Sequence, residues 1–186
     1  EGKLIGETSL DPTDKKLLSG FCFLTEKPIT IVANTGSEVA DTSKLEKQVT
    51  DLGLGIFIMR GDLEMEISRL PVDEQKDFLA DLGVTEPAVK RFVAHIYSRL
   101  KLLSFLTAGE DEVRAWSVRS GALAPEAAGK IHTDLEKGFI RAEVIPFEEL
   151  VAAGGFAEAK KNGKLRLEGK GYEVKDGDVL TIRFNV

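Results

Sequence analysis

Two short apolar runs with an amphipathic segment between them constrain the fold of this 186-residue chain most strongly. Residues 29–33 (ITIVA) and 54–59 (LGIFIM) show no polar alternation, which is typical of strands in a parallel sheet that is covered on both faces. Between them, Leu45, Val49 and Leu52 fall on one stripe of a predicted helix. Strand, helix and strand in this order predict a βαβ unit in the first half of the chain.

Polar residues mark the starts of the predicted helices. Asp11 before Pro12 can accept hydrogen bonds from the free backbone N–H groups of a short helix that ends by Gly20. Thr42 or Ser43 can cap the helix between the two strands. Further helical patterns, which would cover the sheet, occupy residues 62–70, 73–82 and 87–100.

Short strands and turns dominate the chain from residue 101 onward. Residues 101–106 and 113–118 predict a hairpin around the turn residues 108–111. Asp176 and Gly177 predict a last hairpin turn. Helices are expected at residues 125–132, 147–153 and 156–161, and strands at 139–144, 165–167, 172–174 and 179–183. The predicted fold class is therefore α/β followed by α+β, the second part being a compact module with strands around one main helix.

Composition restricts the partners of the chain. A formal net charge of -6 argues against a protein that coats nucleic acid through bulk electrostatics, so any RNA contact must be local. No apolar run approaches the roughly 20 residues that span a bilayer, and we expect a cytoplasmic protein without membrane contact.

The single cysteine excludes an internal disulfide, and its position between Phe21 and Phe23 predicts that Cys22 is a buried thiol.

The two histidines do not predict a metal site, because one distant cysteine cannot complete their ligand set. His95 lies beside apolar residues in a predicted helix, which favours a partly buried structural role. His132 ends a predicted helix, where an imidazole can donate to the terminal carbonyls.

Asn34 is the one polar group that the pattern places at a ligand-binding position. It follows the first predicted strand, and ligands of open α/β sheets bind where the carboxyl ends of strands emerge. A carboxamide can both donate to and accept from a purine edge. An Asn after a strand is also a common turn residue, so position alone leaves both interpretations open.

A series of short motifs in the second half resembles the TGS domain that ends the Obg-like ATPases of the YchF type. The motifs occur in order at residues 105–109 (FLTAG), 111–116 (DEVRAW), 127–134 (AAGKIHTD), 138–144 (GFIRAEV), 176–178 (DGD) and 183–185 (RFN). The resemblance implies that residues 1–100 are the carboxyl-terminal part of a P-loop NTPase domain with a partial Rossmann-like sheet. Residues 101–186 would then be a TGS domain with a β-grasp, ubiquitin-like fold.

The same resemblance implies a nucleotide site that this chain completes only in part. Asn34, Thr35 and Gly61 would form the base side of a pocket for ATP or GTP, with Mg²⁺ in the complete protein. The family carries Asn-x-x-Glu after this strand, whereas Glu38 comes one place late here, so the preferred base stays open. Arg60 replaces a small hydroxyl residue of the family and is either a solvated loop charge or a nucleotide contact.

No Gly-x-x-x-x-Gly-Lys-Ser/Thr motif occurs in the sequence, so nothing in it can cradle a triphosphate. We therefore expect no catalytic residues, no metal ligands and no ATP hydrolysis by this chain alone. The resemblance implies the carboxyl part of a longer protein; a naturally short relative is the alternative.

Basic side chains in the second half are the expected contacts with RNA or the ribosome, since TGS domains occur in ribosome-associated enzymes. Interleaved acidic residues reduce their field, and Trp116 could either face the core or stack on a base. There are two competing hypotheses. The chain could be a stand-alone module that binds RNA or protein without nucleotide, or a stable scaffold for a function that lies in sequence outside these 186 residues. The expected contact residues are Lys130, Arg141, Lys160, Lys161 and Lys164.

Overall fold

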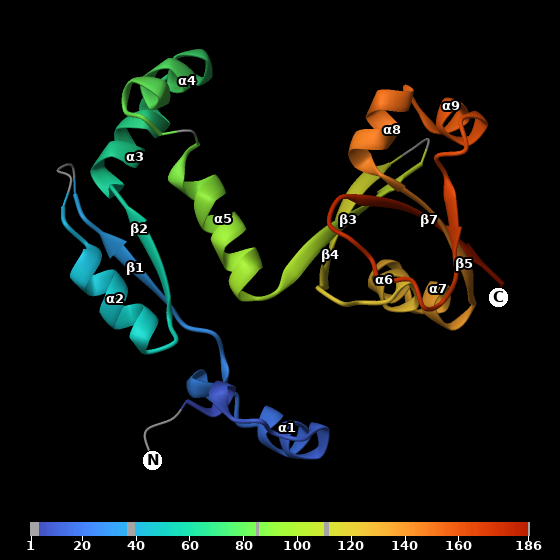
Figure 1. The fold of residues 1–186 in the computed structure, drawn as a ribbon, viewed down its shortest axis with the longest axis horizontal. Helices are drawn as coiled ribbons and strands as arrows, with labels where there is room; N and C mark the ends of the chain where they lie inside the picture. The colour runs from blue at the N-terminus through green and yellow to red at the C-terminus, as the bar shows by residue number, and fades with distance from the viewer. Residues whose placement is uncertain (1–3, 37–39, 85, 110–111, 186) are drawn as a thin grey trace. The chain divides into compact units, whose positions relative to one another are not determined.

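A computed structural model describes residues 4–36, 40–84, 86–109 and 112–185 of the chain. The chain forms two compact units, Glu1–Arg99 (unit 1) and Leu100–Val186 (unit 2), which are coloured blue to green and green to red in Figure 1. Within the described ranges, no helix combines the length and the apolar character needed to cross a membrane.

Unit 1 contains the predicted βαβ arrangement. Strand β1 (Thr30–Asn34) is followed by helix α2 (Ser43–Asp51) and strand β2 (Gly55–Met59). The two strands pair in parallel, with Thr30 opposite Gly55 and Asn34 opposite Met59. Because the register is continuous, the two strands end side by side, and the loops that follow them begin at the same edge of the sheet.

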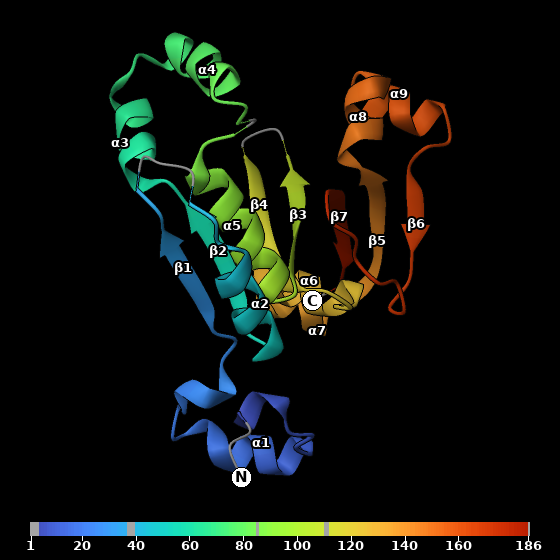
Figure 2. The ribbon, with the colours of Figure 1, turned by 60° about the vertical axis from the view of Figure 1, so that its left-hand side comes forward.

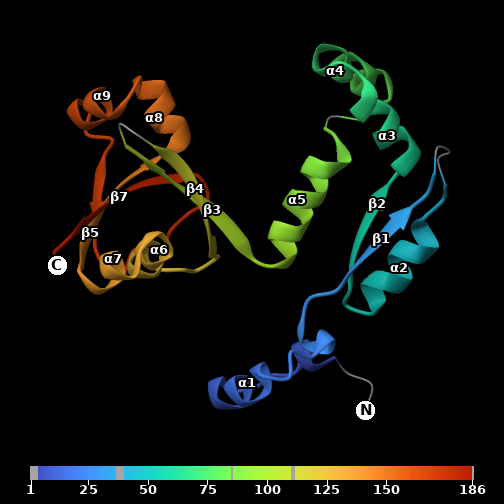
Figure 3. The same ribbon diagram turned by 180° about the vertical axis from the view of Figure 1, so that it is seen from behind.

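Helices α2 and α5 (Ala88–Arg99) lie on opposite sides of this sheet (Figures 1 and 3). The ring of Phe57 in β2 packs edge-on against Phe92 of α5, with centroids 5.1 Å apart. The prediction that the first strand is covered on both faces is wrong for the described structure, because Ile31 and Val32 are 36% and 48% exposed. Among the residues that the structure describes, β1 pairs only with β2, and this small sheet leaves both side chains exposed.

Asp11 and Asp41 accept backbone hydrogen bonds at the starts of α1 (Pro12–Ser19) and α2. The Asp11 carboxylate accepts from the backbone N–H groups of Thr13 and Asp14 and so starts α1, as predicted. At α2, Thr42 occupies the N-cap position, as predicted, but its side chain makes no capping bond to the backbone. Asp41 accepts from the Ser43 backbone N–H, and the Thr42 hydroxyl donates to Glu46 instead.

The remaining elements of unit 1 are short. Two 3-10 helices, η1 (Ile5–Glu7) and η2 (Leu24–Glu26), flank α1. Helices α3 (Gly61–Arg69) and α4 (Val72–Asp81) follow β2, and they enclose a small core of Leu63, Ile67 and Leu79.

Cys22 is exposed, so the predicted buried thiol is wrong. The flanking rings of Phe21 and Phe23 stack on one another, with centroids 5.4 Å apart, and are themselves exposed, so they form no pocket around the sulfur. His95 is partly buried, as expected, with its ring tilted against Phe57. Within the part of the chain that the structure describes, its Nε2 atom is buried without a hydrogen-bond partner.

Unit 2 is built on a five-stranded sheet with the order β4-β3-β7-β5-β6 (Figure 2). Strands β3 (Leu102–Ala108) and β4 (Val113–Arg119) form the predicted antiparallel pair, although turn residues 110 and 111 lie outside the described residues. The other strands are β5 (Phe139–Pro146), β6 (Arg166–Glu168) and β7 (Asp178–Phe184). Strand β7 runs parallel to β3 and antiparallel to β5, so the sheet is mixed.

Helices pack on both faces of this sheet and produce two cores. Helix α6 (Ala124–Ile131) packs against one face through a core that includes Phe105, Val144 and Leu180. Helices α8 (Phe147–Ala153) and α9 (Phe156–Lys161) pack against the other face, over Ile145 and Val179. Consecutive strand residues belong to different cores because side chains alternate across a sheet.

Two local predictions for unit 2 are wrong. Residues 172–174 form no strand, and Glu173 makes a single bridge with Leu123. Asp176 and Gly177 therefore do not close a hairpin; the Asp176 carboxylate accepts from the Ser104 backbone N–H at 2.7 Å and holds the loop before β7 beside β3. The segment before β7 is therefore a loop held against β3, because β7 pairs with the distant strand β3.

His132 lies between two helices: it ends α6, as predicted, where its backbone N–H donates to the Ala128 carbonyl, and it also starts the next helix. Its backbone is extended, and its Nδ1 atom accepts from the Asp134 backbone N–H, which caps α7 (Thr133–Lys137). The predicted donation by its imidazole to terminal carbonyls is therefore wrong, because the side chain faces the following helix as an acceptor.

Asp178 is the buried charged residue of the described chain, with 1% exposure. Its carboxylate accepts from the Tyr172 hydroxyl at 2.7 Å and from the Lys175 backbone N–H at 2.9 Å. Arg166 donates to the same Tyr172 oxygen. Burial, followed by the hydrogen bond and the charge of Asp178, raises the pKa of Tyr172 to about 12.

Candidate functional site

The loops after β1 and β2 are joined by one side chain. The Oδ1 atom of Asn34 accepts from the Gly61 backbone N–H at 3.0 Å and from the Gly36 backbone N–H at 3.3 Å. Both partners are N–H donors, so the carboxamide oxygen must face them. Its Nδ2 group is not needed for these bonds and keeps its donors for another acceptor.

Thr35 and Gly61 complete this junction. The Thr35 backbone N–H donates to the Met59 carbonyl at 3.0 Å, and its hydroxyl lies 3.4 Å from the same oxygen. A Cβ atom at Gly61 would meet the Asn34 carboxamide at 2.8 Å, which is closer than a Cβ contact allows. Glycine at position 61 therefore lets the two loops approach, and the three residues predicted for the base side lie together.

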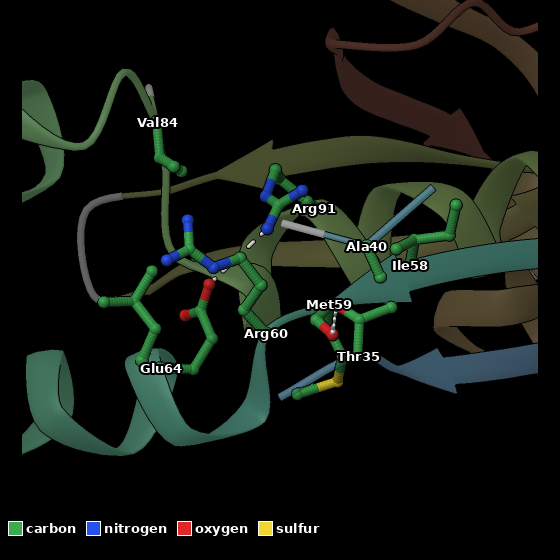
Figure 4. Close-up of a pocket in the computed structure, with 9 residues that line it drawn as sticks. Thr35, Ala40, Ile58, Met59, Arg60, Glu64, Val84 and Arg91 are labelled. Carbon is green, nitrogen blue, oxygen red and sulfur yellow. Dashed lines mark hydrogen bonds and ion pairs between the residues drawn. The ribbon is translucent and has the colours of Figure 1, made fainter. Parts of the chain in front are cut away.

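A small cavity of about 200 Å³ adjoins these loops (Figure 4). Figure 4 shows Arg60, Glu64 and Arg91 directed toward the same part of the cavity. Two arginines and one glutamate give the lining a net charge of +1. The lining residues are Thr35, Ala40, Ile58, Met59, Arg60, Leu63, Glu64, Val84 and Arg91.

Glu64 connects this cavity to α5. Its Oε2 atom accepts from the Ala88 backbone N–H at 2.8 Å, at the start of α5, and its Oε1 atom lies 3.4 Å from an Arg91 nitrogen. The Glu64 side chain is 14% exposed, so these bonds hold a charge that is largely withdrawn from water. Arg91 also lies over the Phe57 ring at 5.7 Å.

Arg60 is partly buried, so it is not simply a solvated loop charge. Its side chain lines the same cavity as Thr35. The contributions of Glu64 and Arg91 were not predicted. Glu64 and Arg91 are 27 positions apart, so no local pattern links them. Their opposite charges were the only sequence signal that they could pair.

The polar groups at the strand ends are of the kinds that can hydrogen-bond a base edge. Carboxamide, hydroxyl and backbone groups converge at the strand ends, whereas the sequence contains no phosphate loop. Among the residues whose positions are described, no group of three His, Cys, Asp or Glu side chains could hold a metal ion.

The five basic residues predicted to face RNA lie on different parts of unit 2. Lys130 is exposed on α6, on one side of the sheet, whereas Arg141 is on β5 and alternates with residues of the α6 core, so it faces the other side. Lys161 and Lys164 form exposed ion pairs with Glu158 at 3.7 Å and Glu149 at 3.3 Å. Lys160 lines a separate cavity beside α9.

Comparison with known proteins gives consistent matches. The YchF-GTPase_C family, described as "Protein of unknown function (DUF933)", matches residues 102–185. The ribosome-binding ATPase YchF of Bacillus subtilis is 45% identical over 179 residues, which are 92% of this chain and 49% of that protein. The ribosome-binding ATPase YchF of Haemophilus ducreyi is 43% identical over 187 residues, covering 98% of this chain and 52% of that protein.

Solved structures show the same similarity. The YchF GTPase of Schizosaccharomyces pombe superposes with a TM-score of 0.80 at 25% identity, over 97% of this chain and 50% of that one. A GTP-binding protein of Pyrococcus horikoshii OT3 superposes with a TM-score of 0.59 at 18% identity, over 87% and 47% of the two chains, and supports the fold alone.

The fold is therefore mixed α/β, of the kind found in the YchF GTPase of Schizosaccharomyces pombe. The chain belongs to the YchF family and corresponds to the carboxyl-terminal portion of YchF proteins. It spans about half the length of the curated relatives that it matches.

Proposed function

We propose that this chain is part of a cytoplasmic, ribosome-associated protein that binds ATP or GTP, and that unit 1 supplies the base side of the nucleotide pocket. The bridge from Asn34 to Gly36 and Gly61 carries this proposal, because it places both base-side loops around one carboxamide. The oxygen holds the loops, and Nδ2 donates to an acceptor on the purine edge.

Unit 1 is, in this proposal, a part of a larger P-loop NTPase domain with a Rossmann-like sheet. Parallel sheets are normally covered on both faces, whereas Ile31 and Val32 of β1 are substantially exposed. Further strands and helices of the same domain would cover them, in keeping with relatives about twice the length of this chain.

Phosphate binding and hydrolysis belong to the complete protein in this scheme. Mg²⁺ would neutralise the developing charge on the phosphates, and its ligands would come from outside the described residues. This chain by itself orients the base, and we expect no turnover from it.

Unit 2 is proposed to be a TGS domain with a β-grasp fold that docks on the ribosome, through RNA or protein. The mixed five-stranded sheet around α6 supports the fold. The relatives are named ribosome-binding ATPases, which supports the partner.

Nucleotide binding tests the proposal for unit 1. The chain, extended by the upstream sequence of its reading frame, is titrated with labelled ATP and labelled GTP in the presence of Mg²⁺. Saturable binding that Asn34→Ala abolishes is expected. Persistent absence of binding would reject the nucleotide site and favour a stand-alone RNA- or protein-binding module.

Ribosome co-sedimentation of the 186-residue chain tests unit 2. Changing Lys160, Lys161 and Lys164 to Glu should reduce pelleting with ribosomes. The matched control changes three exposed lysines of unit 1, Lys44, Lys47 and Lys76, to Glu and should pellet as the parent does. Unaltered pelleting of the unit 2 variant would exclude that patch as the contact.

A further inference from the structure

A second cavity, of about 280 Å³, opens on the face of the unit 2 sheet that carries α8 and α9. Ala108, Phe156 and Leu165 give it an apolar lining, and Glu143, Lys160 and Thr181 supply its polar groups. Ligand pockets for drug-sized molecules run from roughly 300 to 1,000 Å³. This cavity therefore suits one small flat group better than a complete cofactor.

The surrounding sheet surface carries an arrangement of charge that folding alone does not favour. Arg141 of β5 lies directly opposite Arg183 of β7, and both are exposed. Like charges opposite one another destabilise a sheet. Glu143 neutralises Arg183 through a 2.9 Å ion pair, which leaves the charge of Arg141 uncompensated by this carboxylate.

Lys160 adds a third positive charge at the rim. It forms no ion pair among the described residues, in contrast to Lys161, which pairs with Glu158 at 3.7 Å. Together, Arg141, Arg183, Lys160 and Glu143 carry a net charge of +2. An apolar cavity with an aromatic wall inside a positive rim is complementary to a base attached to a phosphate backbone.

We infer that this cavity binds one unstacked base of single-stranded RNA, with Phe156 as the stacking partner. Lys160 and Arg141 contact the neighbouring phosphates, while the Thr181 hydroxyl and the Glu143 carboxylate face the polar edge of the base. A base inside a duplex cannot enter, because it remains stacked and paired. This inference rests on the proposed docking role of unit 2, for which it names the ligand and the residues.

Fluorescence anisotropy of the 186-residue chain with a short labelled oligoadenylate or oligouridylate tests the inference. Phe156→Leu retains an apolar side chain and removes the aromatic ring, and Thr181→Val removes only the hydroxyl. Phe156→Leu should weaken binding roughly five-fold or more. Thr181→Val should change the relative affinity for the two oligonucleotides, because it alters contact with the base edge.

Two lysine variants provide a matched control, since Lys160 and Lys161 are neighbours on α9. Lys160→Gln should weaken binding and lower the dependence of log affinity on log salt concentration by about one. Lys161→Gln, which removes the same charge outside the cavity, should bind as the parent does. Equal losses in both variants, unchanged binding by Phe156→Leu, or equal affinity for duplex RNA would overturn the inference.

Ribosome pelleting of the same variants separates this inference from the broader proposal. Oligonucleotide binding through the cavity without any ribosome pelleting would reject the docking role and leave the RNA pocket intact. The pocket would be rejected, and a protein contact favoured, if the parent chain bound no oligonucleotide while the variants still pelleted with ribosomes as the parent does. Circular dichroism and thermal unfolding establish that each variant is folded.

Discussion

The Asn34 side-chain oxygen lies 3.0 Å from the Gly61 backbone nitrogen, across 27 positions of sequence. This bond joins the loop after β1 to the loop after β2. Because the two strands are parallel and in register, both loops leave the sheet at the same edge. One uncharged side chain therefore fixes the distance between the two walls of the proposed base pocket.

Substitution of Asn34 tests whether its side chain fixes the two loops. Asn34→Asp keeps an oxygen acceptor for both N–H groups, so the free energy of unfolding of unit 1 should change by less than about 0.5 kcal/mol. Asn34→Ala should lower it by about 1–2 kcal/mol, because two donors lose their acceptor. Urea denaturation of the chain measures this difference. Equal stability of the Ala variant and the parent would show that the bridge contributes nothing.

Gly61→Ala should disrupt the same bridge from the opposite side. The new Cβ atom would meet the Asn34 carboxamide at 2.8 Å and displace it, so we expect a loss of about 1–2 kcal/mol in the free energy of unfolding. Gly20→Ala is the control, since its φ is -67° and no heavy atom lies within 4 Å of its added Cβ. Similar losses in both variants would assign the effect to backbone flexibility rather than contact.

Glu64→Ala should loosen the start of α5. The Ala88 N–H and Arg91 both lose a largely buried partner, which should lower the free energy of unfolding by about 1–3 kcal/mol and accelerate hydrogen exchange at Ala88. Glu66→Ala, at an exposed position of the same helix, should have little effect. Protected Ala88 exchange in the Glu64 variant would contradict this role.

Unit 2 should lose stability at strongly alkaline pH through Tyr172. Burial raises the pKa of its hydroxyl to about 12, with the Asp178 hydrogen bond as the next cause, whereas an unfolded tyrosine titrates near pH 10. Between about pH 10 and pH 12 the folded state holds more protons, so the free energy of unfolding falls as pH rises. The contribution is complete below pH 10 and amounts to about 1 kcal/mol, after allowance for solvent screening of a partly exposed group.

Tyr172→Phe isolates this effect in pH-dependent urea denaturation. The variant should be less stable at neutral pH, because Asp178 loses one donor, and its stability should decline less steeply between about pH 10 and pH 12 than that of the parent. Identical slopes for the two proteins would indicate that Tyr172 does not titrate in this way.

Local sequence signals predicted most elements but not the partners of several side chains. Asp11 with Pro12 marked the start of α1 correctly, because an N-cap acts within one turn. Cys22, between two phenylalanines, was predicted to be buried, yet the rings stack on each other and leave it exposed. Residues 172–174 were expected to form a hairpin strand with the last strand, but β7 pairs with β3 and β5 instead.

Sequence patterns were sufficient to predict the βαβ order of unit 1 and the helix and strand types of most of unit 2, and to reveal the resemblance to YchF-type proteins. These features depend on periodicity, capping and ordered motifs that are local in the chain. The three-dimensional fold was needed to show that Asn34 contacts Gly61, that Glu64 accepts from the first residue of α5, and that Arg141 lies opposite Arg183. Such contacts join residues 24 to 42 positions apart, and strand register and helix packing bring them together rather than any pattern in the neighbouring residues.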